Sequence, residues 1–516
     1  MAQASCPDQV EIRTSSPPPI HTRASSFKSS QRPRPTTVLF SVYTANSFVC
    51  ILATCFLLFL LFILSQVSLL YSQSTPSSQW PLSLMHRSQK IILTTSSAIG
   101  PDAATAARAS KLEAVEERLR DAVTFLPLKD LRFADQPADG HTWFMSSLND
   151  TSIGGGPQHL RFPSEGSKGR VLCLRGRDSH DGSWNYYALA WPEALPRSAT
   201  FMSGLTFVSY NHYDYHNLWH GLSTVFPFVA WHQGEGCLRP PERWVLYHWG
   251  ELRAEMGLWL SKLMEGTFGK PTFVEVFDKI KEDSPVCFED AVVMRHSEAG
   301  MSRERMIEAY DLLRCSARRY CNLSSEVNGD GKKRNTIRLT LLLRRRGRSF
   351  RNESAVVGIF RRECDKVEGC RLTVVHSDDL SFCDQVKLMS KTDVLASPNG
   401  AQLTNLFLMD QNSSVMEFLP KGWLRYAGIG QFVYRWLAGW SGMRFEGAWW
   451  DPVGEECPYP EDVARCFDIY KDGQIGHNET HFSEWTAKAL SEAKLRKIGE
   501  AVPNKKQDPI GACACG

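Results

Sequence analysis

An arginine-rich segment follows an apolar run in the C-terminal half of the chain. The run Ile337–Leu343 predicts a buried strand, and residues 344–352 after it read Arg-Arg-Arg-Gly-Arg-Ser-Phe-Arg-Asn. Arginine side chains bind phosphate oxygens through paired hydrogen bonds, and ligands of open α/β sheets bind beyond the carboxyl ends of the strands. The segment is therefore a candidate phosphate site, with a solvated basic loop as the alternative.

A turn of small residues follows a second short apolar stretch, Val394–Ala396. It reads Ser397-Pro-Asn-Gly-Ala-Gln-Leu-Thr-Asn405 and leads into a predicted helix. Backbone N–H groups at such a helix start can bind an anion, helped by the helix dipole. Gly400 has no side chain, which would let a ligand approach the backbone closely. A plain strand–turn–helix connection uses the same residue types and remains the alternative.

Three histidines recur at four-residue spacing between residues 212 and 220. On a helix, His212, His216 and His220 would share one face. A metal site is one interpretation of such a face, but no HExxH motif occurs. An acid–base or acceptor-orienting role for Asp214 or His220 is favoured over a metal site, and core or interface histidines are the default interpretation. The chain also lacks an Asp-x-Asp pair that could hold a metal and a diphosphate, so we expect no metal.

Strands and helices alternate along the part of the chain that must position these residues. Predicted strands cover Arg170–Leu174, Thr200–Tyr210, Ile337–Leu343, Arg371–Val375, Val394–Ala396 and Val415–Phe418. Predicted helices cover His216–Trp231, Glu251–Met264, Glu353–Cys364, Phe382–Ser390 and a segment that opens at Asn405–Met409. This alternation favours βαβ units and a parallel sheet, arranged as two α/β halves that meet near residues 325–335.

Composition places the chain among ordinary folded proteins. Its residues are 43% hydrophobic and 22% charged, and a length of 516 residues fits two or three domains. Lys and Arg number 59 against 56 Asp and Glu, which leaves a net charge of only +3. A charge this small gives no global argument for nucleic-acid binding, so we expect no nucleic-acid partner.

An apolar stretch near the N-terminus predicts a membrane anchor over residues 38–71. No charged side chain occurs between Arg34 and Arg87, and a membrane helix needs roughly 20 apolar residues. A cleaved signal peptide, the alternative, usually has a shorter apolar region that lies closer to the N-terminus. Basic residues outnumber acidic ones in residues 1–35, which predicts a cytoplasmic tail and a lumenal body.

Two further features predict a lumenal body. Asn-x-Ser/Thr sequons, the acceptors of N-glycosylation, occur only beyond the predicted anchor. Their asparagines are Asn149, Asn322, Asn352, Asn412 and Asn478. Ten cysteines lie between residues 173 and 466 and are expected to form disulfide bonds in an oxidising compartment. Cys315–Cys321 and Cys364–Cys370 are candidate local pairs, although sequence alone leaves the connectivity open.

Five motifs, in their order along the chain, resemble glycosyltransferase family 61. They are Tyr215-His-Asn-Leu-Trp-His220, the pattern Leu-Leu-Arg-x-x-x-Arg-x-Phe-x-Asn ending at Asn352, Phe382–Gln385, Ser397–Asn405 and Val415-Met-Glu-Phe-Leu-Pro420. The resemblance spans roughly residues 200–480. The family includes protein O-GlcNAc transferases and β-1,2-xylosyltransferases of the secretory pathway. Residues 449–484, with Cys-Pro-Tyr-Pro, look most like its plant members.

The resemblance implies a GT-B-like α/β fold with two Rossmann-like domains facing a cleft. It also implies an inverting, metal-independent transfer of xylose, arabinose or GlcNAc from a UDP-sugar to a glycan, polysaccharide or glycoprotein. Residues then expected at the donor are Arg344, Arg348, Asn399, Gly400, Ala401, Thr404, Asn405 and Glu417. Residues expected on the acceptor side, as catalytic candidates, are Asp214, His216 and His220. No cofactor is expected beyond the donor substrate.

Three positions depart from the family pattern. The family's His-Gly-Ala-Gly-Leu turn reads Asn399-Gly-Ala-Gln402-Leu here, and Thr224 stands where the family often has an aspartate. An inverting transfer needs a base that takes the proton of the acceptor hydroxyl. The missing carboxylate therefore leaves one alternative, a catalytically silent relative that acts as a lumenal binding partner or complex subunit. A hydrolase is disfavoured because no Gly-x-Ser-x-Gly motif occurs.

The expected organisation follows from these features. It comprises a cytoplasmic tail (1–37), an anchor region (38–71), a stem (72–135) with a helix near Ala104–Val123, an N-terminal acceptor-side domain (136–330), a C-terminal nucleotide-sugar domain (331–475), and a C-terminal helix and tail (476–516). This layout predicts a single-pass type II protein of the Golgi membrane with a lumenal catalytic domain; the endoplasmic reticulum is the alternative.

Overall fold

The computed structural model describes most of the chain beyond residue 155. The described residues are 110, 111, 114, 125–127, 155–165, 167–211, 214–237, 239–248, 250–281, 283–295, 301–323, 336–454 and 456–500. The predicted tail and anchor, Asn149, His212 and most of the predicted stem lie outside them. In the part that is described, no helix is long and apolar enough to span a membrane.

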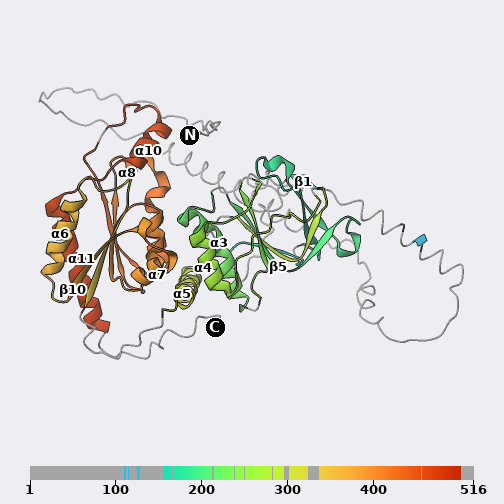
Figure 1. Cartoon of the computed structure of the whole chain (residues 1–516), viewed down its shortest axis with the longest axis horizontal. Helices are drawn as coiled ribbons and strands as arrows, with labels where there is room; N and C mark the ends of the chain where they lie inside the picture. Colours follow the sequence, from blue (N-terminus) through green and yellow to red (C-terminus); the bar gives the residue numbers. More distant parts are fainter. Residues whose placement is uncertain are drawn as a thin grey trace, which may run out of the picture. The chain divides into compact units, whose positions relative to one another are not determined.

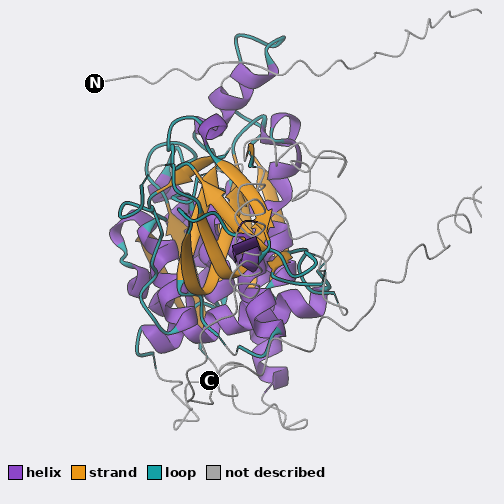
Figure 2. Ribbon diagram, turned by 90° about the vertical axis from the view of Figure 1, so that its right-hand side faces the viewer, coloured by secondary structure: helices purple, strands orange, loops and turns teal. Residues whose placement is uncertain are grey.

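The first sheet is mixed rather than parallel. Figure 1 draws most of its strands in green tones, and Figure 2 colours the strands of both sheets orange. Its described strands are β1 (Leu126–Pro127), β2 (Leu160–Phe162), β3 (Val171–Arg175), β4 (Tyr186–Ala190), β5 (Thr200–Asn211), β6 (Arg243–His248), β7 (Glu251–Arg253) and β8 (Val286–Arg295). They run in the order β1-β4-β3-β8-β5-β6-β7, with β2 beside β8. Only the β5–β6 and β5–β8 pairs are parallel, because the other neighbours pair antiparallel.

The second sheet is wholly parallel, as the alternating pattern predicts. Its strands are β9 (Ile337–Leu343), β10 (Cys370–His376), β11 (Val394–Pro398), β12 (Ser414–Leu419) and β13 (Arg444–Trp450). They run in the order β10-β9-β11-β12-β13. The chain therefore reverses its direction of travel across the sheet between β9 and β11, which lie side by side. In open α/β sheets, ligands bind outside the strand ends at such a point.

Helices follow the strands of both sheets (Figure 1). The α-helices are α3 (Leu218–Gly234), α4 (Leu258–Phe268), α5 (Arg303–Tyr320), α6 (Glu353–Asp365), α7 (Phe382–Met389), α8 (Trp423–Tyr426), α9 (Val433–Trp440), α10 (Val463–Asp472) and α11 (Glu479–Glu500). The 3-10 helices are η4 (Gly182–Trp184), η5 (Pro192–Ala194), η7 (Ser377–Asp379), η8 (Ala401–Leu408) and η9 (Gly428–Phe432).

Side-chain caps fix where several of these helices begin. The carboxamide of Asn217 accepts hydrogen bonds from backbone N–H groups of the first turn of α3. Asn352 caps α6 in the same way, and Ser381 with Asp384 forms a capping box at α7. Each cap satisfies N–H groups that have no partner inside the helix. The loops between the strands and these helices therefore end at defined residues.

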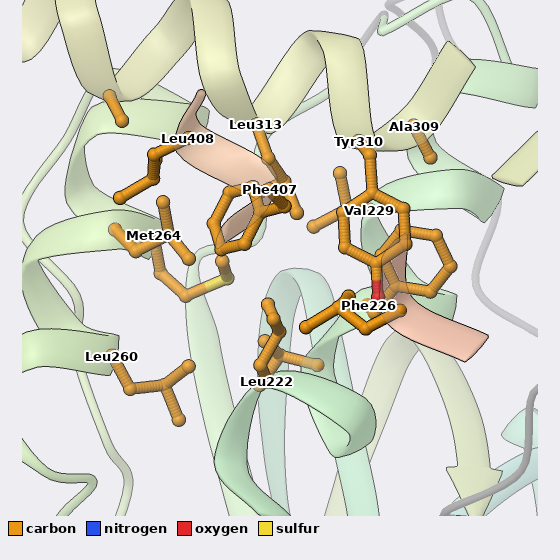
Figure 3. Packing of buried hydrophobic residues seen from close by; sticks show 14 of the residues in the cluster. Leu222, Phe226, Val229, Leu260, Met264, Ala309, Tyr310, Leu313, Phe407 and Leu408 are labelled. Carbon is orange, nitrogen blue, oxygen red and sulfur yellow. The ribbon is translucent and has the colours of Figure 1, made fainter. Parts of the chain in front are cut away.

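The central strands of the second sheet, β9, β11 and β12, are buried on both faces. Alternate residues of these strands point to opposite sides and enter different clusters. Leu341 and Ala396 pack with α6 and α11 in one cluster. Leu342 and Leu395 belong to another cluster, which also contains α3, α4, α5 and η8. Figure 3 shows the contributions of those four helices to this core. The phenyl ring of Phe407 lies at its centre, 5.5 Å from the ring of Tyr310.

Charged and polar side chains tie α4 and α5 to the η8 segment. The guanidinium of Arg314 is buried and donates to the carbonyls of Phe407 and Ser441, at 2.8 Å each. The indole N–H of Trp259 on α4 donates to Asn405 Oδ1 at 3.1 Å. These bonds satisfy buried carbonyls that would otherwise be costly to leave unpaired. They also bring elements of the first half of the chain against η8.

Two sequence-based predictions of elements are wrong in part. The predicted helix Glu251–Met264 begins instead at Leu258, because residues 251–253 form β7, which pairs antiparallel with β6. Gly250 takes a φ of +82° at that reversal, a conformation that favours glycine. The segment that opens at Asn405–Met409 lies within a buried 3-10 helix that begins earlier, at Ala401. Strand β13 was not predicted.

The disulfide bonds of the described residues include Cys173–Cys287, Cys321–Cys383, Cys364–Cys370 and Cys457–Cys466. The predicted pair Cys364–Cys370 is confirmed. The candidate pair Cys315–Cys321 is wrong, because Cys321 at the end of α5 bonds to Cys383 at the start of α7. Packing of α5 beside α7 decides this connectivity, and a 62-residue separation hides it from the sequence.

Candidate functional site

The arginine segment and the small-residue turn meet at the reversal point of the second sheet. Arg344 follows β9 directly, and Asn399 follows β11, the neighbouring parallel strand. Parallel strands bring their carboxyl ends to the same edge, so residues 55 positions apart come into contact. Arg344 Nη1 donates to the Asn399 carbonyl at 3.1 Å and lies 3.3 Å from Gln402 Oε1.

Gly400 provides room for Arg344. A Cβ placed on Gly400 would collide with the Nη1 atom of that arginine. The sequence suggested that Gly400 would admit a ligand to the backbone. In this structure the guanidinium occupies that space, so the glycine seats the arginine. Burial lowers the pKa of Arg344 from its ordinary value, because desolvation disfavours its charge.

Arg348 is held from three sides. Its Nη1 donates to Asn399 Oδ1 at 2.7 Å, and its guanidinium lies over the ring of Trp423, 5.1 Å from the ring centroid. The backbone takes a φ of +60° and donates to the Gly473 carbonyl at 3.2 Å. Burial lowers the pKa of Arg348 to about 10, and repulsion from the charge of Arg344 is the second cause. The side chain is therefore still positive at neutral pH.

Several buried polar atoms at this site have no hydrogen-bond partner within the described part of the chain. They are the Nε atoms of Arg344 and Arg348, Trp423 Nε1 and Glu417 Oε2. Neither arginine forms an ion pair with a described carboxylate. Unpaired buried donors are rare in native proteins because each costs free energy. Three of these four atoms are N–H donors, a set suited to a ligand that brings negatively charged oxygens.

Glu417 and Tyr434 are buried beside the two arginines. Glu417, on β12, is fully buried and accepts from Asn399 Nδ2 at 2.6 Å. Burial raises the pKa of Glu417 to about 8, against smaller opposing effects of Asn399 and Arg348. Tyr434 is buried on α9, and burial also raises its pKa. Hydrogen bonds of Asn399 connect Glu417 to Arg348.

The other residues expected at the turn have different surroundings. Thr404 and Asn405 are buried in η8. Asn405 uses its Oδ1 atom for the bond from Trp259 and its Nδ2 atom for a bond to the Gln402 carbonyl at 3.0 Å. Its carboxamide is therefore already engaged by the protein. Ala401 is partly exposed at the start of the same helix.

The acceptor-side candidates lie at and just before the first turn of α3. Helix α3 begins at Leu218, so His216 precedes it, and the predicted histidine face is wrong for that residue. Asp214 Oδ1 accepts from the backbone N–H of His216 at 2.7 Å. His220 is in the first turn of α3, where burial lowers its pKa while Asp214 opposes the shift. A neutral imidazole at this position can accept a proton.

The start of α3 approaches the arginine site through two aromatic rings. Trp219, the neighbour of His220, lies with its ring 6.2 Å from that of Tyr434. Tyr434 in turn interacts electrostatically with Arg344, Arg348 and Glu417. Thr224 cannot replace the aspartate found in the family, because its hydroxyl is buried and donates to the His220 carbonyl at 2.7 Å.

An open cavity of about 500 Å³ lies beside His216. Its lining residues are His216, Ala254, Glu255, Met256, Leu258, Ser261, Thr272 and Val274. Glu255 Oε1 lies 3.7 Å from His216 Nε2, and Asp214 Oδ1 lies 3.9 Å from the same atom. No cluster of three or more His, Cys, Asp or Glu side chains that could hold a metal occurs within the residues the structure describes.

Comparison with protein families assigns this arrangement. A family model described as Glycosyltransferase 61 matches residues 196–416. The match covers 221 of the 516 residues, and this part of the chain carries a glycosyltransferase family 61 domain. The matched segment contains the first turn of α3, both arginines and the turn after β11, and it ends one residue before Glu417. The two regions described above therefore lie in, or directly beside, a glycosyltransferase domain.

Two further comparisons add little to this assignment. A comparison with curated proteins gives no match. Among solved structures, the X-ray structure of an oxidoreductase from Corynebacterium diphtheriae is 11% identical, with a TM-score of 0.21. That likeness covers 32% of this chain and 98% of the other. A similarity this low carries no argument about the glycosyltransferase.

Sequence reasoning missed four residues of this glycosyltransferase that surround the candidates. They are Glu255, Gln402, Trp423 and Tyr434. Gln402 had a signal, because it stands where the family has glycine. Tyr434 and Trp423 had none, because aromatic residues in an amphipathic segment are typical of a core.

Proposed function

We propose that the chain is an inverting, metal-independent glycosyltransferase that uses a UDP-sugar. It transfers xylose, arabinose or GlcNAc to a glycan, polysaccharide or glycoprotein in the secretory pathway. Family membership supports the reaction class. Two α/β sheets with helices support an α/β glycosyltransferase fold, and the GT-B arrangement, with two domains facing a cleft, is part of this proposal.

The single observation that carries the donor assignment is the pair of arginines at the reversal point of the second sheet. Arg344 and Arg348 are positively charged, largely buried, and unpaired with any described carboxylate. Their Nε atoms are buried donors without a partner in the described structure. A diphosphate supplies the oxygens and the negative charge that these groups lack. The leaving UDP gains negative charge as its bond to the sugar breaks, and fixed cations stabilise that charge.

The acceptor reacts on the side of α3. The oxygen of an acceptor hydroxyl forms the new bond to the anomeric carbon while the bond from that carbon to the UDP oxygen breaks. His220 takes the hydroxyl proton, because burial keeps its imidazole neutral. Asp214 and His216 bind and orient the acceptor beside it. The contact between Trp219 and Tyr434 supports placing this reaction next to the arginines.

We place the protein in the Golgi membrane as a single-pass type II protein with a lumenal catalytic domain. The disulfide bonds of the described residues support an oxidising compartment. The asparagines of the four described sequons are solvent-exposed, as glycosylation requires. They are Asn322, Asn352, Asn412 and Asn478. The endoplasmic reticulum remains the alternative compartment.

The test is a donor assay on the full-length protein in detergent. The protein is incubated with UDP-xylose, UDP-arabinose and UDP-GlcNAc in the presence of EDTA, and UDP release is measured with and without a mixture of glycan acceptors. We expect turnover of one donor. UDP binding without turnover of any donor would favour the catalytically silent relative. Loss of turnover in EDTA that returns with a divalent cation would contradict the metal-independent mechanism.

A further inference from the structure

A series of hydrogen-bonded polar side chains links the core of the second sheet to the arginine site. It runs from Glu417 on β12, through the carboxamide of Asn399, to the guanidinium of Arg348. The two hydrogen bonds are 2.6 Å from Asn399 Nδ2 to Glu417 Oε1 and 2.7 Å from Arg348 Nη1 to Asn399 Oδ1. Asn399 is 2% exposed and Glu417 is 0% exposed, so the bond between them is shielded from water.

The chemistry of the two ends fixes the orientation of the amide between them. Arg348 can only donate, so the Asn399 oxygen must face it. The Asn399 NH₂ group must then face Glu417, whose Oε1 atom accepts. Because Glu417 Oε2 has no partner in the described structure, that oxygen is the place for a proton. A buried, unpaired carboxylate would be costly, and the neutral acid avoids that cost.

We propose that Glu417 and Asn399 are positioning residues for Arg348: the buried carboxyl remains a neutral acid and orients the Asn399 amide, which aims the guanidinium at the donor diphosphate. This inference rests on the proposed function. A neutral Glu417 also leaves the charge of Arg348 uncompensated. An ionised Glu417 would neutralise part of that charge and would repel the diphosphate. Glu417 thus acts through Arg348 and does not itself contact the nucleotide.

The charged and titratable groups around Glu417, Asn399 and Arg348 explain how UDP binding responds to pH. From the end of β9, Arg348 favours the ionised form of Glu417, and Arg344 acts on Arg348 by repulsion. From α9, Tyr434 faces Glu417 and is neutral in the physiological range. From α10, Asp472 acts on both arginines. A bound diphosphate adds negative charge, so it opposes ionisation of Glu417 and binds best while that group holds its proton.

The affinity for UDP is expected to fall as the pH rises from 7 to 9. With a pKa of about 8 in the free protein, Glu417 is mostly protonated at pH 7 and mostly ionised at pH 9. If only the protonated form binds UDP, the affinity falls about tenfold over this interval. The terminal phosphate of UDP contributes little change there, because it titrates near pH 6.

The test is titration calorimetry of UDP with the full-length protein in detergent at pH 7, 8 and 9. We expect the wild-type dissociation constant to rise about tenfold from pH 7 to pH 9. Glu417→Gln, an uncharged isostere of the protonated acid, should reduce that ratio to about one. Glu417→Ala removes the acceptor for Asn399 and should weaken binding at all three pH values, and this deficit should be absent in the glutamine variant. Glu353→Gln, which changes an exposed carboxyl paired with His376, should keep the wild-type ratio.

Asn399→Asp provides a second arm that leaves Glu417 in place. The new carboxylate would pair with Arg348 and could not donate to Glu417, so UDP binding should weaken at least tenfold at pH 7.5. A wild-type pH ratio in Glu417→Gln, or wild-type affinity in Asn399→Asp, would overturn the positioning role. UDP binding by the wild type with no loss at pH 9 would contradict this role alone. Absence of UDP binding at every pH would contradict the proposed function as well.

Discussion

The carboxyl end of the second sheet and the start of α3 hold their polar groups in opposite ways. Arg348, Asn399 and Glu417 are joined by hydrogen bonds in a region from which water is largely excluded. Asp214 and His216 have side chains that are 65% and 54% exposed. Asp214 accepts a hydrogen bond from the backbone N–H of His216, while the His216 imidazole lies 3.7 Å or more from the carboxylates of Glu255 and Asp214.

The difference shows what each region can do before a substrate arrives. A buried, bonded cluster holds its charges in place, so it stabilises a diphosphate without reorganising. Exposed side chains at α3 remain free to adapt, and the acceptor itself completes that site. His220 stands between these two cases, because it is half-buried and belongs to the first turn of a capped helix. The predictions below test this division, from the largest expected effect to the smallest.

Replacement of His220 should separate chemistry from donor binding. We expect His220→Ala to lower kcat by roughly 10²- to 10⁴-fold, the usual contribution of a general base, with little change in the dissociation constant of UDP. His232→Ala is the matched control, because His232 lies on the same helix and its pKa is also lowered by burial. Steady-state kinetics and calorimetry measure the two quantities. A kcat within threefold of the wild type would remove His220 from the reaction.

Replacement of Arg348 should have the converse effect, on donor affinity. Loss of charged hydrogen bonds worth about 1.5–3 kcal/mol predicts that Arg348→Ala weakens UDP binding roughly 10- to 100-fold. Arg345→Ala is the control from the same arginine run, because Arg345 is exposed and pairs with Asp379 at 2.7 Å. Calorimetric titration with UDP measures both. Equal effects of the two variants would show that the run acts only through its overall charge.

The bond between Trp259 and Asn405 connects α4 to the turn of the arginine site. Trp259→Phe keeps an aromatic ring against Phe407 but leaves the buried Oδ1 atom of Asn405 without its donor. We expect the free energy of unfolding to fall by about 1–3 kcal/mol. Denaturant unfolding measures it, with Trp191→Phe at an exposed position as the control. Unchanged stability would mean that water replaces the indole at this bond.

The smallest expected effect is a shift in the acid limb of the pH profile of kcat. Because burial lowers the pKa of His220 below its ordinary value of 6.5, the imidazole stays neutral in mildly acidic solution. Turnover should therefore decline only below that pH. Asp214 opposes the shift, so Asp214→Asn should move the acid limb to still lower pH. A limb that moves upward in this variant would contradict the assignment of the limb to His220.

The local elements of both regions follow from the sequence because their causes are local. The apolar run Ile337–Leu343 and the alternation around it predicted β9 and its neighbours. A central strand of a parallel sheet is covered on both faces, so nearly all of its residues are apolar. The caps Asn217 and Ser381 stand where their helices begin. The resemblance to the family also follows from residue types and order, and the family model confirms it over residues 196–416.

Tertiary structure alone decided which residues meet. The sequence contains no signal that Tyr434 lies beside Glu417, that Trp259 bonds to Asn405, or that Cys321 pairs with Cys383. The register of the parallel strands sets the contact of Arg348 with Asn399, and burial sets the protonation of Glu417. Both depend on packing between segments that are distant in sequence, and residue spacing along the chain carries no record of that packing.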